Sequence, residues 1–129
     1  MKTVLVVEDN KDNLQIITYA LQRAGYEVVS AATGEEGVEL ALANQPVFII
    51  MDISLPGIDG IETTRRIRAA EGGKTIPIVA MTAYAMRGDS DVILAAGCCG
   101  YFEKPIDPLT IVAQIQKVLG RSARGQGNG

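Results

Sequence analysis

The stretch VFIIMDISLPGIDG, residues 47–60, places an acidic residue, Asp52, directly after five apolar residues. Continuous apolar runs of this length are typical of strands that are buried on both faces of a parallel sheet. The Pro-Gly and Asp-Gly pairs that follow indicate a loop. An ionised carboxylate is costly to bury without a partner, so Asp52 must be hydrated, neutralised or used in chemistry.

The same pattern recurs along the chain, in which short apolar runs alternate with segments of helical period. The runs predict strands at 3–7, 26–31, 47–51, 76–81 and 99–103, and the periodic segments predict helices at about 12–25, 33–44, 60–70, 86–96 and 107–119. Asp107 is expected to cap the last helix, with Pro108 as its first residue. Strict alternation of strand and helix predicts an α/β fold, a parallel sheet with helices on both faces.

The overall composition sets limits on domain number and partners. With 129 residues, 47% of them hydrophobic, the chain fits one globular domain, which we place at residues 1–120, followed by a disordered tail or linker remnant at 121–129. The net charge of −3 argues against direct nucleic-acid binding. Apolar runs are too short for a membrane span or a signal peptide, so we expect a cytoplasmic protein without membrane contact.

Histidine is absent, and the two cysteines, Cys98 and Cys99, are adjacent. Zinc sites built from Cys and His are therefore excluded. The chain also has no imidazole base and no phosphohistidine of its own.

Reactive side chains follow four of the predicted strands. Ligands bind beyond the carboxyl ends of strands in such sheets, and those ends carry Glu8, Asp9, Asp52, Thr82 and Lys104. Each alone has an ordinary interpretation; Asp9, for example, could cap the next helix. If the first and third strands are neighbours, however, three carboxylates converge. An all-oxygen acidic site of this kind favours a hard cation such as Mg²⁺, with room for a phosphoryl group.

Four motifs at these spacings resemble the receiver domain of two-component response regulators, and the resemblance covers residues 3 to about 119. They are VLVVEDN (4–10), IIMDISLPGIDG (49–60), IVAMTAYA (78–85) and GYFEKPI (100–106). The resemblance implies a flavodoxin-like (βα)5 sandwich with strand order 2-1-3-4-5. It also implies a phosphorylation switch that catalyses at most its own phosphorylation and dephosphorylation.

The resemblance assigns a role to each matching position. Asp52 is the implied phosphoacceptor, and Lys104 is the implied contact of the phosphoryl group. Mg²⁺ is implied to bind Asp9, Asp52 and the Ser54 carbonyl directly and Glu8 through water. Thr82 and Tyr101 are the implied switch pair, and the bond before Pro105 is implied to be cis. Glu8 stands where many members have a second Asp. Ser54 and Tyr84 occupy positions that tune dephosphorylation in the family.

The implied partners are proteins. Because the chain lacks histidine, the phosphodonor is expected to be a sensor histidine kinase, a histidine phosphotransfer protein or a small phosphodonor. A downstream protein effector is expected to contact Tyr84, Met86 and Arg87. The stretch TAYAMRGD is most similar to single-domain regulators of the bacterial cell-cycle type.

Three alternatives stay open at this point. A hydrolase with an Asp nucleophile usually has a second Asp two residues on, where this chain has Ser54. A flavin-binding domain of flavodoxin type has the same fold order, but the loop VEDNKDN is acidic and lacks a phosphate cradle. An interaction module that no longer uses phosphate would not need the full set of acids.

Overall fold

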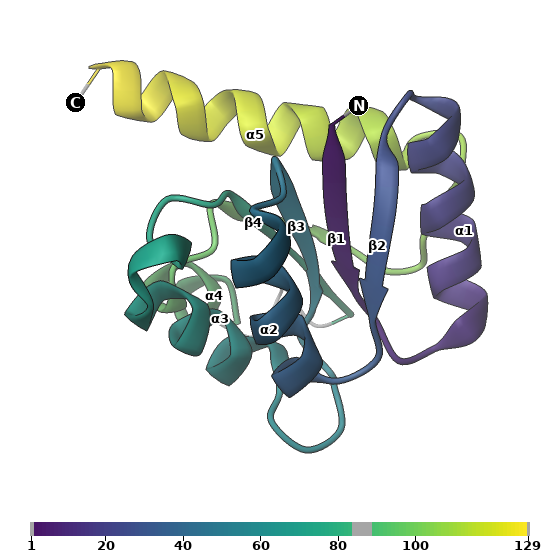
Figure 1. The fold of residues 1–129 in the computed structure, drawn as a ribbon. Coiled ribbons are helices and arrows are strands. Elements are labelled where there is room, and N and C mark those ends of the chain that lie inside the picture. The colour runs from purple at the N-terminus through teal and green to yellow at the C-terminus, as the bar shows by residue number, and fades with distance from the viewer. Residues whose placement is uncertain (1, 84–88, 129) are drawn as a thin grey trace.

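The structure is a computed structural model that describes residues 2–83 and 89–128. Strands and helices alternate along the chain (Figure 1). The elements are β1 (Thr3–Val7), α1 (Lys11–Arg23), β2 (Glu27–Ala31), α2 (Gly34–Asn44), β3 (Phe48–Asp52), α3 (Gly60–Ala69), the short 3₁₀ helix η1 (Glu71–Gly73), β4 (Ile78–Thr82), α4 (Asp89–Ala96), β5 (Gly100–Glu103) and α5 (Ile111–Asn128).

The strands form one parallel sheet in the order β2-β1-β3-β4-β5, which confirms the predicted fold. The direction of the strand order reverses at β1, because β2 lies on one side of it and β3 on the other. The register pairs Val7 with Met51 and Asp52 with Met81. The carboxyl ends of β1, β3 and β4 therefore lie at one edge of the sheet.

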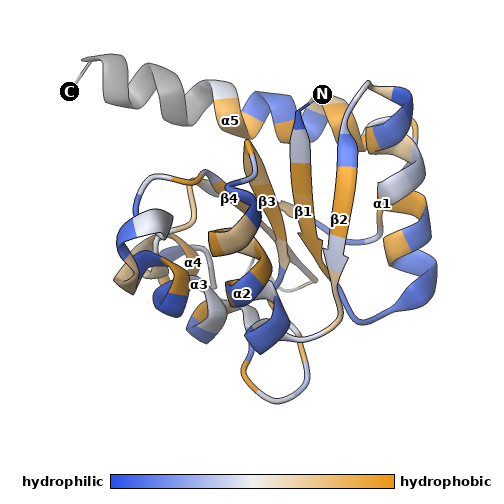
Figure 2. Cartoon of the chain, in the orientation of Figure 1, coloured by the Kyte–Doolittle hydropathy of each residue, from blue (hydrophilic) through white to orange (hydrophobic). Residues whose placement is uncertain are grey.

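Each face of the sheet has its own hydrophobic core, because side chains alternate along each strand. On β1, Leu5 and Val7 pack with residues of α2, α3 and α4, whereas Val4 and Val6 pack with residues of α1 and α5. Figure 2 shows β1 and β3 as hydrophobic along most of their length. Every residue of β3 and β4 is buried, as expected for central strands.

Side-chain caps fix where three of the helices begin. Asn10 caps α1, Thr33 caps α2 and Asp59 caps α3, each by accepting a hydrogen bond from the backbone N–H three residues further on. Asn10, and not Asp9, is therefore the cap of α1. The cap of α1 therefore does not use the carboxylate of Asp9.

The last helix differs from its prediction at both ends. A turn at Asp107, whose carboxylate accepts a hydrogen bond from the Leu109 N–H, precedes the helix, which begins at Ile111. The helix does not end at Leu119 but continues to Asn128. A glycine within a helix costs only about 1 kcal/mol, so Gly120 weakens this helix without ending it.

Smaller differences affect strand bounds. β3 and β4 each include the polar residue at the carboxyl end, Asp52 and Thr82 respectively, because backbone pairing continues one residue past the apolar run. Among the described residues, no helix has both the length and the apolar character that crossing a bilayer requires.

Candidate phosphorylation and metal site

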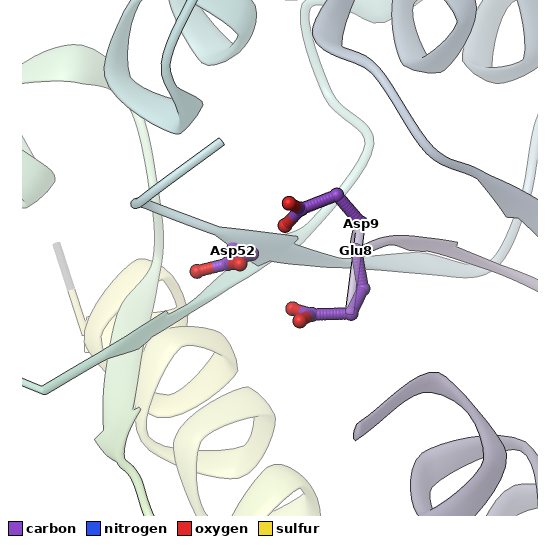
Figure 3. Close-up of side chains that lie close together, drawn as sticks. All are labelled: Glu8, Asp9 and Asp52. Carbon is purple, nitrogen blue, oxygen red and sulfur yellow. The ribbon is translucent and has the colours of Figure 1, made fainter. Parts of the chain in front are cut away.

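Three carboxylates gather at the switch point of the sheet. Glu8 and Asp9 follow β1, and Asp52 ends β3, so the pairing of these two strands brings the acids together. One carboxylate oxygen from each lies within 4.8 Å of the others. Figure 3 shows Glu8 and Asp9 on the two sides of the chain, with their carboxylates reaching toward Asp52.

Asp52 is almost completely buried, with 1% of its surface exposed. Its Oδ1 accepts a hydrogen bond from Lys104 Nζ at 2.9 Å and another from the backbone N–H of Ser54 at 3.0 Å. The Lys104 side chain is 21% exposed and comes from the loop after β5. The Asp52 carboxylate at the end of β3 is therefore paired with a lysine from the loop after β5.

Glu8 is also 1% exposed, and its two oxygens differ in their surroundings. Oε1 accepts hydrogen bonds from the backbone N–H of Asn10 and from Asn13 Nδ2, both at 3.3 Å. Oε2 is buried and has no hydrogen-bond partner in the described part of the chain. The pKa of Glu8 is raised to about 7, first by burial and then by the neighbouring Asp52 carboxylate, whereas Lys104 and Asn13 lower it.

This arrangement fits a hard cation. Three carboxylates this close repel one another, and a buried oxygen without a donor lacks a compensating positive charge. Mg²⁺ prefers oxygen ligands and usually binds one or two carboxylates together with water and phosphate. Asp9 is exposed and Asp52 is buried, so the site faces solvent at Asp9 and the protein interior at Asp52.

The remaining predicted site residues lie on β4 and β5. Thr82 is 2% exposed at the end of β4, and its carbonyl accepts a hydrogen bond from the Lys104 N–H at 3.0 Å. Tyr101 on β5 is half-buried and packs against the core on the face of α2, α3 and α4. The peptide bond between Lys104 and Pro105 is cis.

The predicted partner contacts Tyr84, Met86 and Arg87 lie outside the described residues.

Sequence reasoning missed three residues that support the site. Asn10 and Asn13 hold Glu8, and a Cβ on Gly60 would lie against the carbonyl oxygen of Asp52. The signal for the two asparagines was present in the repeated Asn of VEDNKDN, directly after the acidic pair. Only the path of the loop after β3 shows that Gly60 returns to the end of that strand.

The comparisons with known proteins agree with this geometry. The family model described as the response regulator receiver domain matches residues 4–116. The chain belongs to this family, and it is a receiver domain of the two-component type, a phosphoacceptor switch. Membership favours the phosphorylation switch over the hydrolase and the flavin domain. The complete acid group and the Lys104–Asp52 pair argue against the phosphate-independent module.

Curated relatives cover nearly the whole chain. The polar-differentiation response regulator DivK of Brucella ovis is 37% identical over 119 residues, which are 92% of this chain and 97% of the relative. DivK of Brucella anthropi is 36% identical over the same shares of the two chains.

Solved structures show the same fold. The chemotaxis protein CheY4 of Vibrio cholerae has a TM-score of 0.85 at 32% identity, covering 92% of this chain and 98% of that one. The receiver domain of a sensor histidine kinase from Pseudomonas aeruginosa has a TM-score of 0.83 at 38% identity over the same shares, and that structure has a magnesium ion coordinated in its active-site cleft.

Proposed function

We propose that Asp52 is the phosphoacceptor of this receiver domain, which spans residues 1–120. The observation that carries the proposal is the setting of its carboxylate, which is buried at a strand end between the Lys104 ammonium and two further carboxylates. A carboxylate oxygen can form a bond to phosphorus and give an acyl phosphate. With a phosphohistidine donor, the P–N bond breaks as this bond forms. The donor ring leaves as neutral imidazole, because it keeps the proton on its other nitrogen.

We propose that Asp9 and Asp52 bind Mg²⁺ directly, together with the carbonyl of Ser54, and that Glu8 acts on it through water. Bound Mg²⁺ would neutralise charge shared between the acceptor carboxylate and the incoming phosphoryl group. The unpartnered Glu8 Oε2 supports this assignment, as does the magnesium ion in the Pseudomonas aeruginosa receiver domain.

Lys104 and Thr82 are proposed to bind the oxygens of the phosphoryl group. The Lys104 Nζ lies 2.9 Å from Asp52 Oδ1, so it is placed to donate a hydrogen bond to an oxygen of a phosphoryl group on Asp52. The hydroxyl of Thr82 would donate to a phosphoryl oxygen and move toward it. Tyr101, half-buried on the neighbouring strand, would then move into the space that Thr82 leaves.

This movement would change the face formed by α4, β5 and α5. A groove of about 300 Å³ lies there, lined by Tyr101 and Phe102 of β5 and by Gln114 and Lys117 of α5, among others. We propose that a downstream protein effector reads this face, with Tyr84, Met86 and Arg87 as further contacts. A histidine kinase or phosphotransfer protein would supply the phosphate in the cytoplasm, a reducing compartment in which Cys98 and Cys99 stay in the thiol form.

Incubation with acetyl phosphate and Mg²⁺ tests the proposal directly. Intact-protein mass spectrometry should show one added phosphoryl group on the wild type and none on Asp52→Asn. Asp12→Asn is the matched control, because Asp12 is an exposed acid in the first turn of α1. Phosphorylation of Asp52→Asn at the wild-type rate would exclude Asp52 as the acceptor.

A further inference from the structure

We infer that Asn13 is a positioning residue for the metal site, and that it allows a glutamate to serve at position 8. The inference rests on the proposed magnesium site. It concerns how the acid after β1 is oriented by the helix that follows it.

The first step is the asymmetry of the Glu8 carboxylate. Two donors, the Asn10 N–H and Asn13 Nδ2, bind the same oxygen, Oε1, each at 3.3 Å. The other oxygen, Oε2, is buried without a partner among the described residues. Fixing one oxygen of a carboxylate fixes the direction of the other, so these contacts orient the carboxylate of Glu8, which belongs to the group of three acids.

The second step is the source of the two donors. Asn10 caps α1, and its side chain accepts a hydrogen bond from the Asn13 N–H at 2.9 Å. This cap sets the first turn of α1, and the turn places the half-buried Asn13 side chain against Glu8. The backbone cap does not depend on the Asn13 amide group. Removing that amide therefore removes the contact with Glu8 and leaves the start of the helix in place.

The third step is the length of the acid. Glu8 reaches past the end of β1 to a donor in the first turn of α1, five positions along the chain. An aspartate at position 8 is shorter by one methylene group and cannot reach that donor from the same backbone position. Glu8 and Asn13 therefore form a matched pair, and Asn13 has no such role when an aspartate occupies position 8.

A double-mutant cycle on Mg²⁺ affinity, measured by isothermal titration calorimetry, tests this pairing. The four proteins are the wild type, Asn13→Ala, Glu8→Asp and the double variant. We expect Asn13→Ala to weaken Mg²⁺ binding roughly threefold when Glu8 is present. This is less than the roughly 10–100-fold typical for a group that supports a directly ligating residue, because Glu8 acts on the ion through water. In the Glu8→Asp background the same change should have roughly no effect.

Gln15→Ala is the matched control, because Gln15 is an exposed amide residue on the same helix. Circular dichroism of each sample in EDTA verifies that the variants are folded. Equal weakening in both backgrounds, or no weakening in the wild type, would overturn the role of Asn13. A wild type that binds no Mg²⁺ would instead overturn the magnesium site of the proposed function, and the inference with it.

Discussion

Replacing Glu8 by Gln is expected to stabilise the magnesium-free protein at pH 8. The glutamine keeps an oxygen for the Asn10 and Asn13 donors, and its NH₂ group takes the place of the unpartnered Oε2 beside Asp52. The glutamine therefore removes a buried charge while it keeps the shape of the side chain.

The magnitude follows from the pKa of Glu8, which burial raises from 4.5 to about 7. The folded protein holds the proton on Glu8 more tightly than the unfolded chain does. Stability is therefore lost as the pH rises from about 4.5 to 7, and the loss is complete above pH 7. A shift of this size corresponds to about 3 kcal/mol at most. For a domain of this length, that is a difference in Tm on the order of 10 °C.

Urea denaturation in EDTA at several pH values is the assay. Glu8→Gln should be more stable than the wild type at pH 8, and the difference should shrink toward pH 4.5. Glu27→Gln, which removes an exposed carboxylate from the edge strand β2, controls for net charge. Added Mg²⁺ should stabilise the wild type more than Glu8→Gln, since the glutamine removes a charge from the site. A difference that is constant with pH, or a less stable Glu8→Gln at pH 8, would refute the reasoning.

Three further predictions concern residues that support the fold. Gly60→Ala should lower the free energy of unfolding by about 2 kcal/mol, measured by urea denaturation, because the new Cβ would meet the Asp52 backbone. Arg68→Met should lower it by about 2–3 kcal/mol in the same assay, because Arg68 Nε and Nη2 donate to the carbonyl of Gly97, at 3.0 and 2.7 Å. Burial raises the pKa of Cys98 to about 11, so the stability of the wild type should fall as the pH rises above about 9, and Cys98→Ala should flatten this fall.

Each of these predictions has a contradicting outcome. A Gly60→Ala variant as stable as the wild type would show that the loop after β3 can move away from that strand. Arg66→Met, which removes an exposed arginine paired with Glu62, is the control for Arg68→Met, and equal losses would refute the special role of Arg68. An unchanged alkaline decline in Cys98→Ala would assign that decline to other groups.

Much of the fold was readable from local patterns. An apolar run is a local feature of the sequence, so the buried strand before Asp52 is determined by neighbouring residues. The far end of α5 was not predictable in this way. A helix end depends on a balance of small terms, and one glycine, Gly120, did not outweigh the others.

The sequence by itself determined which side chains stand at the strand ends, because the strand pattern places Glu8, Asp9 and Asp52 at the carboxyl ends of the first and third strands. Only the tertiary structure decided how those acids are partnered. The contact of Lys104 with Asp52 spans 52 positions and depends on the order of strands in the sheet. The contact of Asn13 with Glu8 depends on the angle at which α1 leaves β1. A hydrogen bond forms only when donor and acceptor are placed to within a few tenths of an ångström. Packing of the elements sets that placement, and residue spacing along the chain does not.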